Sequence, residues 1–205
     1  TCHTPMKFWA AWREEDITYA QMYALRNHKL STEQIHALFD HRPSVDLKWY
    51  QQLIDGGELA VSGQDKLLIS LLSPERLLEM TRFFTLFDKK TGKIVARYQQ
   101  VFGIKRLLER ISTRRPDGGR EGGVIWHTTG SGKSYTMVFL SKALILHDSL
   151  KRCRIVVVTD RIDLEEQLSN TFASGGELAG KKDKANAMAT SGQMLAKQIG
   201  SGKER

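Results

Sequence analysis

Residues 123–146 constrain the fold more than any other part of the chain. They begin with the letters GVIWHTTGSGKS and continue into the apolar run YTMVFLSKALIL. The order is a short apolar strand, a glycine-containing turn and the start of a helix, which is the context that a phosphate-binding loop requires. The segment therefore predicts an α/β domain with a nucleotide site at the turn.

Each residue type in this turn suits the binding of a triphosphate. Glycine adopts positive φ without steric penalty, so Gly130 and Gly132 allow successive backbone N–H groups to face one phosphate. The following helix adds the positive end of its dipole, Lys133 reaches the β- and γ-phosphates, and the Ser134 hydroxyl coordinates Mg²⁺. The predicted nucleotide-binding residues of the turn are Thr129, Gly130, Ser131, Gly132, Lys133 and Ser134, with Lys133 also the predicted catalytic residue and Ser134 the predicted Mg²⁺ ligand.

Two departures test this interpretation. The strict eight-residue pattern has glycine at the position that His127 holds, and the letters Gly-Ser-Gly-Lys recur at residues 200–203. The second copy follows no apolar strand, has Glu204 where a hydroxyl is needed and precedes no apolar helix, so we expect a loop there. The first copy agrees with a phosphate loop in its context as well as in its pattern.

A second apolar, β-branched run follows the predicted helix at residues 154–159. Two buried strands joined by a helix form a right-handed βαβ unit with a parallel sheet, and ligands bind at the carboxyl ends of its strands. We therefore expect Thr159 and Arg161 at the same edge as the phosphate loop. Two roles are open for these residues. Thr159 or Arg161 contacts a nucleic-acid backbone, or Arg161 forms a local ion pair with Asp160.

The rest of the chain divides into a helical part and the start of the α/β part. We expect a mostly helical accessory segment over residues 1–82 and an incomplete α/β domain over residues 83–205. The further predicted elements are a helix capped by Ser31, a helix opened by Ser73 and Pro74, a hairpin turning at residues 88–92, a helix from Tyr98 with a stripe of Val101, Ile104, Leu108 and Ile111, and a short helix over residues 192–199.

The charge balance favours an anionic partner. Lys and Arg number 31 against 23 Asp and Glu, a formal net charge of +8, and basic side chains gain affinity for phosphate backbones by releasing counterions. Between residues 97 and 120, seven basic residues outnumber two acidic ones. A solvated helix face and a phosphate-binding surface explain this cluster equally well.

Composition and the chain ends favour a cytoplasmic protein with no membrane span. No apolar run reaches the ~18 residues that a membrane-spanning helix needs. The sequence has two cysteines and its first residues do not resemble a signal peptide.

Four strings in this order resemble the motor (R) subunit of type I restriction enzymes, over about residues 66–205. They are LLSPERLLEMTRFFTLFD, KIVARYQQVFGIKRLLERI, GGVIWHTTGSGKSYTMVFLSKALI and RIVVVTDRIDLEEQLSNTF. The family is similar to superfamily 2 helicases, with a nuclease domain followed by two RecA-like motor domains. The resemblance implies a fragment of such a subunit, with an incomplete RecA-like P-loop NTPase domain.

The resemblance also implies roles for individual residues. Arg97 and one of two glutamines match the glutamine motif that reads adenine, where we favour Gln100 over Gln99. Thr159 and Arg161 match the motif that contacts DNA in related motors. The implied cofactors are ATP and Mg²⁺. The implied partners are double-stranded DNA and the methylation and specificity subunits of a type I restriction-modification complex.

Two functional elements of the family are expected outside this sequence. The acidic motif that positions Mg²⁺ and water is expected after Arg205, and the nuclease carboxylates before Thr1. We therefore expect weak nucleotide binding and negligible hydrolysis by the chain alone. The alternatives are another P-loop enzyme, such as a small-metabolite kinase, which needs a catalytic acid and an arginine lid that we do not find, and a catalytically inactive fragment.

Overall fold

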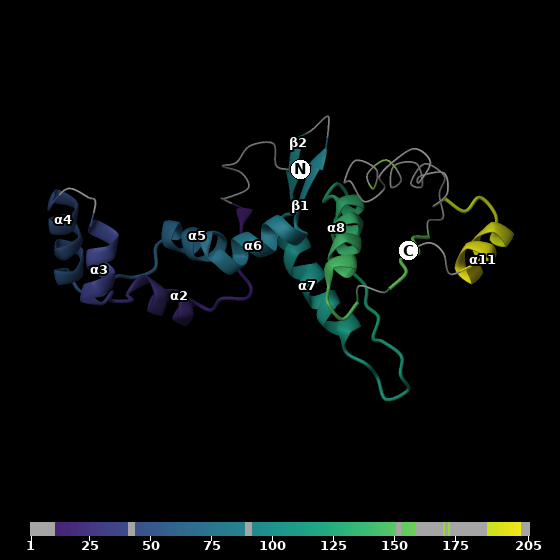
Figure 1. The fold of residues 1–205 in the computed structure, drawn as a ribbon, viewed down its shortest axis with the longest axis horizontal. Helices are drawn as coiled ribbons and strands as arrows, with labels where there is room; N and C mark the ends of the chain where they lie inside the picture. The colour runs from purple at the N-terminus through teal and green to yellow at the C-terminus, as the bar shows by residue number, and fades with distance from the viewer. Residues whose placement is uncertain are drawn as a thin grey trace. The chain divides into compact units, whose positions relative to one another are not determined.

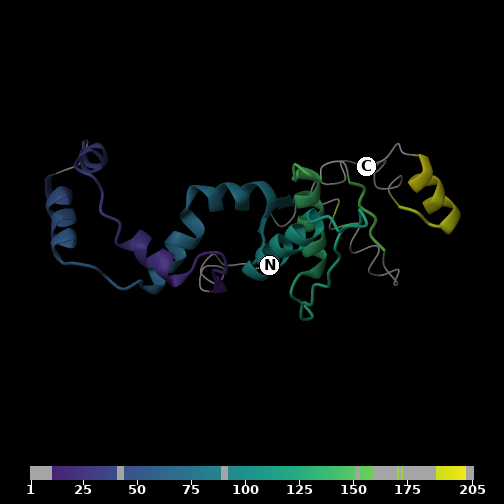
Figure 2. The same cartoon turned by 90° about the horizontal axis from the view of Figure 1, so that it is seen from below.

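The computed structural model forms two compact units, which Figures 1 and 2 show in two views and which are described separately below. One unit contains residues 12–77, and the other contains the residues before Trp12 together with residues 78 onward. The domain boundary at residues 82 and 83 stays a prediction. The structure describes residues 11–40, 44–88, 92–150, 153–158, 170, 172 and 188–201.

The described elements are mostly helices. The helices are α2 (Tyr19–Arg26), α3 (Thr32–Phe39), α4 (Ser44–Asp55), α5 (Gly63–Leu72), α6 (Pro74–Phe83), α7 (Tyr98–Ser112), α8 (Lys133–Leu146) and α11 (Gly192–Ser201), and the strands are β1 (Thr85–Asp88) and β2 (Gly92–Val95). Among these helices, none has the length and apolarity that crossing a membrane requires.

Side-chain caps fix the helix starts in the first unit. Thr18, Ser31 and Ser62 each accept a hydrogen bond from the backbone N–H three residues later, which satisfies a donor that the helix itself leaves unpaired. The predicted start at Ser31 is confirmed. Helices α2 and α5 are in contact, and Arg26 Nε lies 3.1 Å from Asp65 Oδ1 between them.

A buried arginine joins the first residues of this unit to the beginning of α6. Arg76 is 5% exposed, and its Nη2 lies 2.8 Å from Glu14 Oε1 and 3.2 Å from Asp16 Oδ2. Its guanidinium also stacks over the buried ring of Trp12. Trp12 is therefore a core residue of this unit.

The core of the second unit lies between the hairpin and two helices. Strands β1 and β2 pair antiparallel with Thr85 opposite Val95, which confirms the predicted hairpin. Lys142 Nζ on α8 donates to the Thr85 carbonyl at 2.8 Å. The most deeply buried apolar side chains of the described residues are Phe84, Leu86, Ala96, Val101, Phe102, Ile104, Val138, Phe139 and Ala143.

Helices α7 and α8 lie side by side, and their N-terminal ends meet at the same end of the pair (Figures 1 and 2). The predicted stripe of α7 faces this contact, since Val101 and Ile104 are fully buried. The predicted start of α8 at Lys133 is confirmed. Residues 113–132 return from the far end of α7 to the start of α8, so the helix pair places the predicted nucleotide site beside the first turn of α7.

The structure does not confirm the predicted parallel sheet. Residues 121–128 and 153–158 form no strand, and the described part of the chain contains only the antiparallel β1–β2 sheet. Val124, Trp126 and Val158 are 93%, 89% and 82% exposed. A parallel strand needs ladder partners and cover on both faces, and the described residues supply neither, so the two buried strands expected here are not confirmed.

The structure also corrects the expectation of a loop at the second Gly-Ser-Gly-Lys sequence, near the C-terminus. Gly200 and Ser201 are the last residues of α11, not part of a loop, although the predicted short helix over residues 192–199 is confirmed. The rest of the repeat lies outside the described residues. Gly200 has no positive φ, whereas Gly130 and Gly132 both do, so the two copies differ in backbone conformation.

Candidate nucleotide-binding site

Residues 128–131 form a tight turn ahead of α8. The Thr128 carbonyl accepts from Ser131 N at 3.2 Å and from Ser131 Oγ at 2.7 Å. Gly130 occupies the third position of this turn with φ +77°. Positive φ at that position is the requirement of a type II turn and favours glycine, so the turn geometry itself calls for Gly130.

Gly132 is the residue at which the turn becomes helix α8. It has φ +88° and ψ +37°, and its carbonyl accepts the first helical hydrogen bond from Thr136 N at 3.0 Å. Thr18, Ser31 and Ser62 cap their helices with hydroxyls, but glycine offers no side chain for this purpose. The first N–H groups of α8 therefore have no side-chain cap from Gly132, and the helix dipole favours an anion at this end.

The structure brings the predicted phosphate-loop residues together at this helix end. Lys133 and Ser134 are the first two residues of α8, and Thr129 and Ser131 belong to the preceding turn. Lys133 is exposed and Ser134 is half-buried. Ser131 donates its hydroxyl proton within the turn, a structural use in addition to the predicted one.

The predicted glutamine motif meets the same site from α7. Gln100 is 5% exposed and bonds to both Gly132 and Thr136 of the α8 start. Arg97 is the half-buried N-cap of α7, and Gln99 is exposed. Sequence reasoning missed Thr136, whose only signal is a hydroxyl one helical turn after Gly132.

Gly132→Ala is expected to lower the free energy of unfolding by about 1–2 kcal/mol, because a Cβ disfavours the left-handed conformation. The added Cβ also meets Gln100 Nε2 at 3.1 Å. Gly103 is the matched control, since it lies inside α7 without positive φ and without any atom within 4 Å of an added Cβ. Gly103→Ala is expected to stabilise by about 0.5–1 kcal/mol. Urea unfolding measures both, and equal effects at the two positions would contradict the strained conformation of Gly132.

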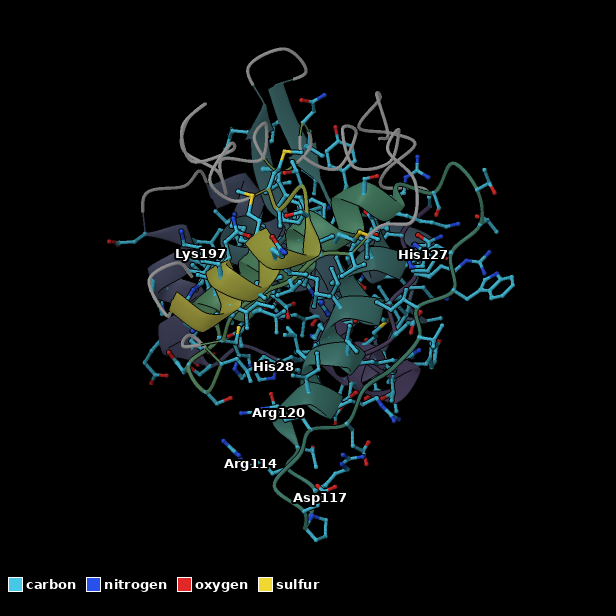
Figure 3. All side chains as sticks on the ribbon, turned by 90° about the vertical axis from the view of Figure 1, so that its right-hand side faces the viewer. His28, Arg114, Asp117, Arg120, His127 and Lys197 are labelled. Carbon is cyan, nitrogen blue, oxygen red and sulfur yellow. The ribbon has the colours of Figure 1, made fainter. Side chains whose placement is uncertain are left out.

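The basic cluster that follows α7 has partners within the chain. Figure 3 shows Arg114, Asp117 and Arg120 together on the loop after α7, with His127 apart from them. Arg120 Nη1 donates to the last two carbonyls of α7, and Arg115 lies 3.2 Å from Asp117. Cations at a helix C-terminus are favoured by the helix dipole. These contacts give the cluster a structural use, and a phosphate-binding surface stays a prediction.

The predicted DNA-contacting residues, Thr159 and Arg161, lie outside the described residues. Ser134, the predicted Mg²⁺ ligand, lies within the described residues. Over the part of the chain that the structure describes, no group of three or more His, Cys, Asp or Glu residues is placed to hold a metal ion. A Mg²⁺ ion at Ser134 would therefore take further ligands from phosphate oxygens and water.

Comparison with known proteins assigns this site to a family. The SWI2/SNF2 ATPase family model matches residues 99–205, a segment that begins at Gln99 and includes the predicted phosphate-loop residues. The type I restriction enzyme HindI endonuclease subunit of Haemophilus influenzae is 44% identical over 117 residues, or 55% of this chain and 11% of that protein. The putative type I restriction enzyme MjaIXP endonuclease subunit of Methanocaldococcus jannaschii is 33% identical over 141 residues, or 66% of this chain and 13% of that protein.

The matched part of the chain covers only 11% and 13% of the lengths of these two relatives. No solved structure matches the chain. The matches confirm the resemblance to endonuclease subunits of type I restriction enzymes, and the chain belongs to the SWI2/SNF2 ATPase family.

Proposed function

We propose that this chain is the ATP-binding part of the DNA-translocating motor of a type I restriction endonuclease. One observation carries the proposal. Two glycines with positive φ lead into the uncapped start of α8, where Lys133 and Ser134 stand, in a chain that belongs to an ATPase family. The relatives that match are named as endonuclease subunits, which supports the restriction context.

Each residue of the turn has a separate role in binding ATP. The N–H groups at the start of α8 donate to phosphate oxygens, and the Lys133 ammonium offsets the charge of the β- and γ-phosphates. The Ser134 hydroxyl would hold Mg²⁺, which would supply positive charge beside the phosphates. Arg97 and the glutamines beside it lie at the start of α7, next to this turn. The acid that activates water belongs to a motif expected beyond Arg205, so hydrolysis needs more than this chain.

The motor role extends the proposal to partners. ATP binding between two RecA-like lobes would drive their closure and step the enzyme along double-stranded DNA. Thr159 and Arg161 would contact the DNA backbone, and methylation and specificity subunits would complete the restriction complex. The net charge of +8 supports an anionic partner.

We expect the chain to bind ATP weakly and to hydrolyse it at a negligible rate. The chain joined to the remaining motor segments is expected to hydrolyse ATP only when duplex DNA is present. A coupled phosphate-release assay with and without duplex measures this difference. Hydrolysis that is independent of DNA and stimulated by a small metabolite would favour a kinase and contradict the motor.

A further inference from the structure

The hydroxyl of Thr136 connects helix α8 to the glutamine that is expected to contact adenine. Thr136 is 6% exposed and Gln100, in the first turn of α7, is 5% exposed. Gln100 Nε2 donates to Thr136 Oγ1 at 3.1 Å and to the Gly132 carbonyl at 3.1 Å. Gln100 Oε1 accepts from Arg97 N at 2.9 Å. These bonds join the start of α7 to the buried side of α8.

A single amide proton of Gln100 suffices for both acceptors on α8. Thr136 Oγ1 and the Gly132 carbonyl oxygen are 3.3 Å apart, and each lies 3.1 Å from Gln100 Nε2. This nearly equilateral triangle subtends only about 60° at the nitrogen, whereas the two protons of a planar amide diverge by about 120°. One N–H that points between the two oxygens forms a bifurcated hydrogen bond. The second N–H of Gln100 then stays available to a ligand.

The groups of Gln100 that remain match the edge of adenine. An amide side chain has two N–H donors and an oxygen with two lone pairs. Gln100 uses one donor toward α8 and one lone pair for Arg97 N. One donor and one acceptor are left, which is the pair that N7 and the N6 amino group of adenine require. Guanine presents two acceptors at the same positions, so this pair favours ATP over GTP.

The hydroxyl of Thr136 is the more available of the two acceptors on α8. The Gly132 carbonyl already accepts from Thr136 N at 3.0 Å and from Thr136 Oγ1 at 3.3 Å. These two donors match the two lone pairs of a carbonyl oxygen. The Thr136 hydroxyl has then given its own proton to Gly132 and faces Gln100 as an acceptor. The anchored N–H of Gln100 therefore depends mainly on the Thr136 oxygen.

We propose that Thr136 is a positioning residue for the base, whose hydroxyl holds one N–H of Gln100 so that the remaining donor and acceptor of the amide contact adenine. This inference rests on the proposed nucleotide-binding function and deepens it. The Thr136 N–H holds the Gly132 carbonyl whatever the side chain at this position is. The affinity for adenine therefore depends on the Thr136 hydroxyl, and the affinity for the triphosphate does not.

The test compares ATP, GTP and inorganic tripolyphosphate, each with Mg²⁺, on the full 205-residue chain. Thr136→Val keeps the shape of the side chain and is expected to weaken ATP binding by about 3- to 10-fold, the contribution of one hydrogen bond. The affinities for GTP and tripolyphosphate are expected to stay unchanged. Equal losses for all three ligands would place the effect on the phosphate loop and overturn the proposal, as would an unchanged affinity for ATP.

Two further variants control for the substitution itself. Thr136→Ser retains the hydroxyl and is expected to bind ATP as the wild type does. Thr113→Val removes an exposed hydroxyl that donates to the Glu109 carbonyl at 3.1 Å, at the far end of α7. No change in ATP affinity is expected there. A loss in Thr136→Ser as large as in Thr136→Val would contradict a role of the hydroxyl.

A double-mutant cycle shows whether Thr136 acts through Gln100. Gln100→Ala is expected to remove the preference for ATP over GTP. In that background Thr136→Val is expected to cause no further loss of ATP affinity, because the group that it positions is already absent. Additive losses would mean that Thr136 acts independently of Gln100 and would overturn the proposal.

The two proposals fail in different ways. If the wild-type chain bound none of the three ligands, the proposed nucleotide site itself would be contradicted, and this inference with it. If the wild-type chain bound tripolyphosphate and showed equal affinity for ATP and GTP, the phosphate site would stand and the positioning role of Thr136 would fall.

Discussion

Lys133→Ala is expected to weaken the affinity of the chain for ATP by about 10- to 100-fold, since a hydrogen bond to a charged group contributes ~1.5–3 kcal/mol. Lys133 is the exposed first residue of α8, directly after Gly132. No cap from Gly132 competes for the adjoining N–H groups. In the proposed site its ammonium neutralises triphosphate charge, and alanine removes the ammonium while keeping the helix.

A fluorescent ATP analogue titrated into both proteins measures the change. Lys197→Ala is the matched control, because Lys197 is exposed on another helix, α11, and its loss lowers the net charge by the same amount. A general charge effect would weaken binding equally in both variants. Equal affinity of wild type and Lys133→Ala would remove the nucleotide site from this turn.

Phe139→Ala is expected to lower the free energy of unfolding by about 3–5 kcal/mol, the usual cost of emptying a buried aromatic site. Phe139 is fully buried in the middle of α8, and its ring lies 6.4 Å from that of Phe84, measured between centroids. This contact joins the helix that begins at the phosphate loop to the residue that precedes β1. Loss of the contact is therefore expected to weaken ATP binding as well.

Met137→Ala is the control, because Met137 lies on the same helix and is 41% exposed. Its truncation is expected to cost less than about 1 kcal/mol, since little apolar surface leaves the core. Thermal or urea unfolding of the two variants gives the comparison. Similar losses for Phe139→Ala and Met137→Ala would contradict the packing of α8 on the hairpin.

The elements that the sequence predicted correctly depend on contacts between residues that are close together in the chain. The start of α3 follows from the Ser31 hydroxyl and the glutamine three residues later, which bond within a few residues of the chain. The turn at Gly130 and the start of α8 at Lys133 follow from glycine's access to positive φ. Each of these features is decided by neighbours in sequence, so one sequence suffices to find it.

The partners of Gln100 lie beyond the reach of such signals. Its bonds to Gly132 and Thr136 span 32 and 36 residues, and they exist because α7 and α8 pack side by side. The sequence marked Gln100 through resemblance alone and assigned it to adenine. Only the packing of the two helices indicates that its amide bonds to α8.

The expected parallel sheet depends on distant partners in the same way. Runs of β-branched residues indicate that a segment is suited to a buried strand, but pairing depends on partners elsewhere. Residues 155–158 are apolar and β-branched, and they form no strand in the described part of the chain. The hairpin β1–β2 was predictable because each strand has its partner only a few residues away.

The fluorescence of Trp126 reports on the surroundings of the region that precedes the predicted phosphate loop. At 89% exposure it emits as an indole surrounded by water, and any segment that shields it will shift its fluorescence to shorter wavelength. Trp12 is buried and Trp49 is 59% exposed in the other unit, so the signal of Trp126 is the difference in fluorescence between the chain and its Trp126→Phe variant. The assembly of a complete motor domain around this chain is thus readable in solution without an added dye.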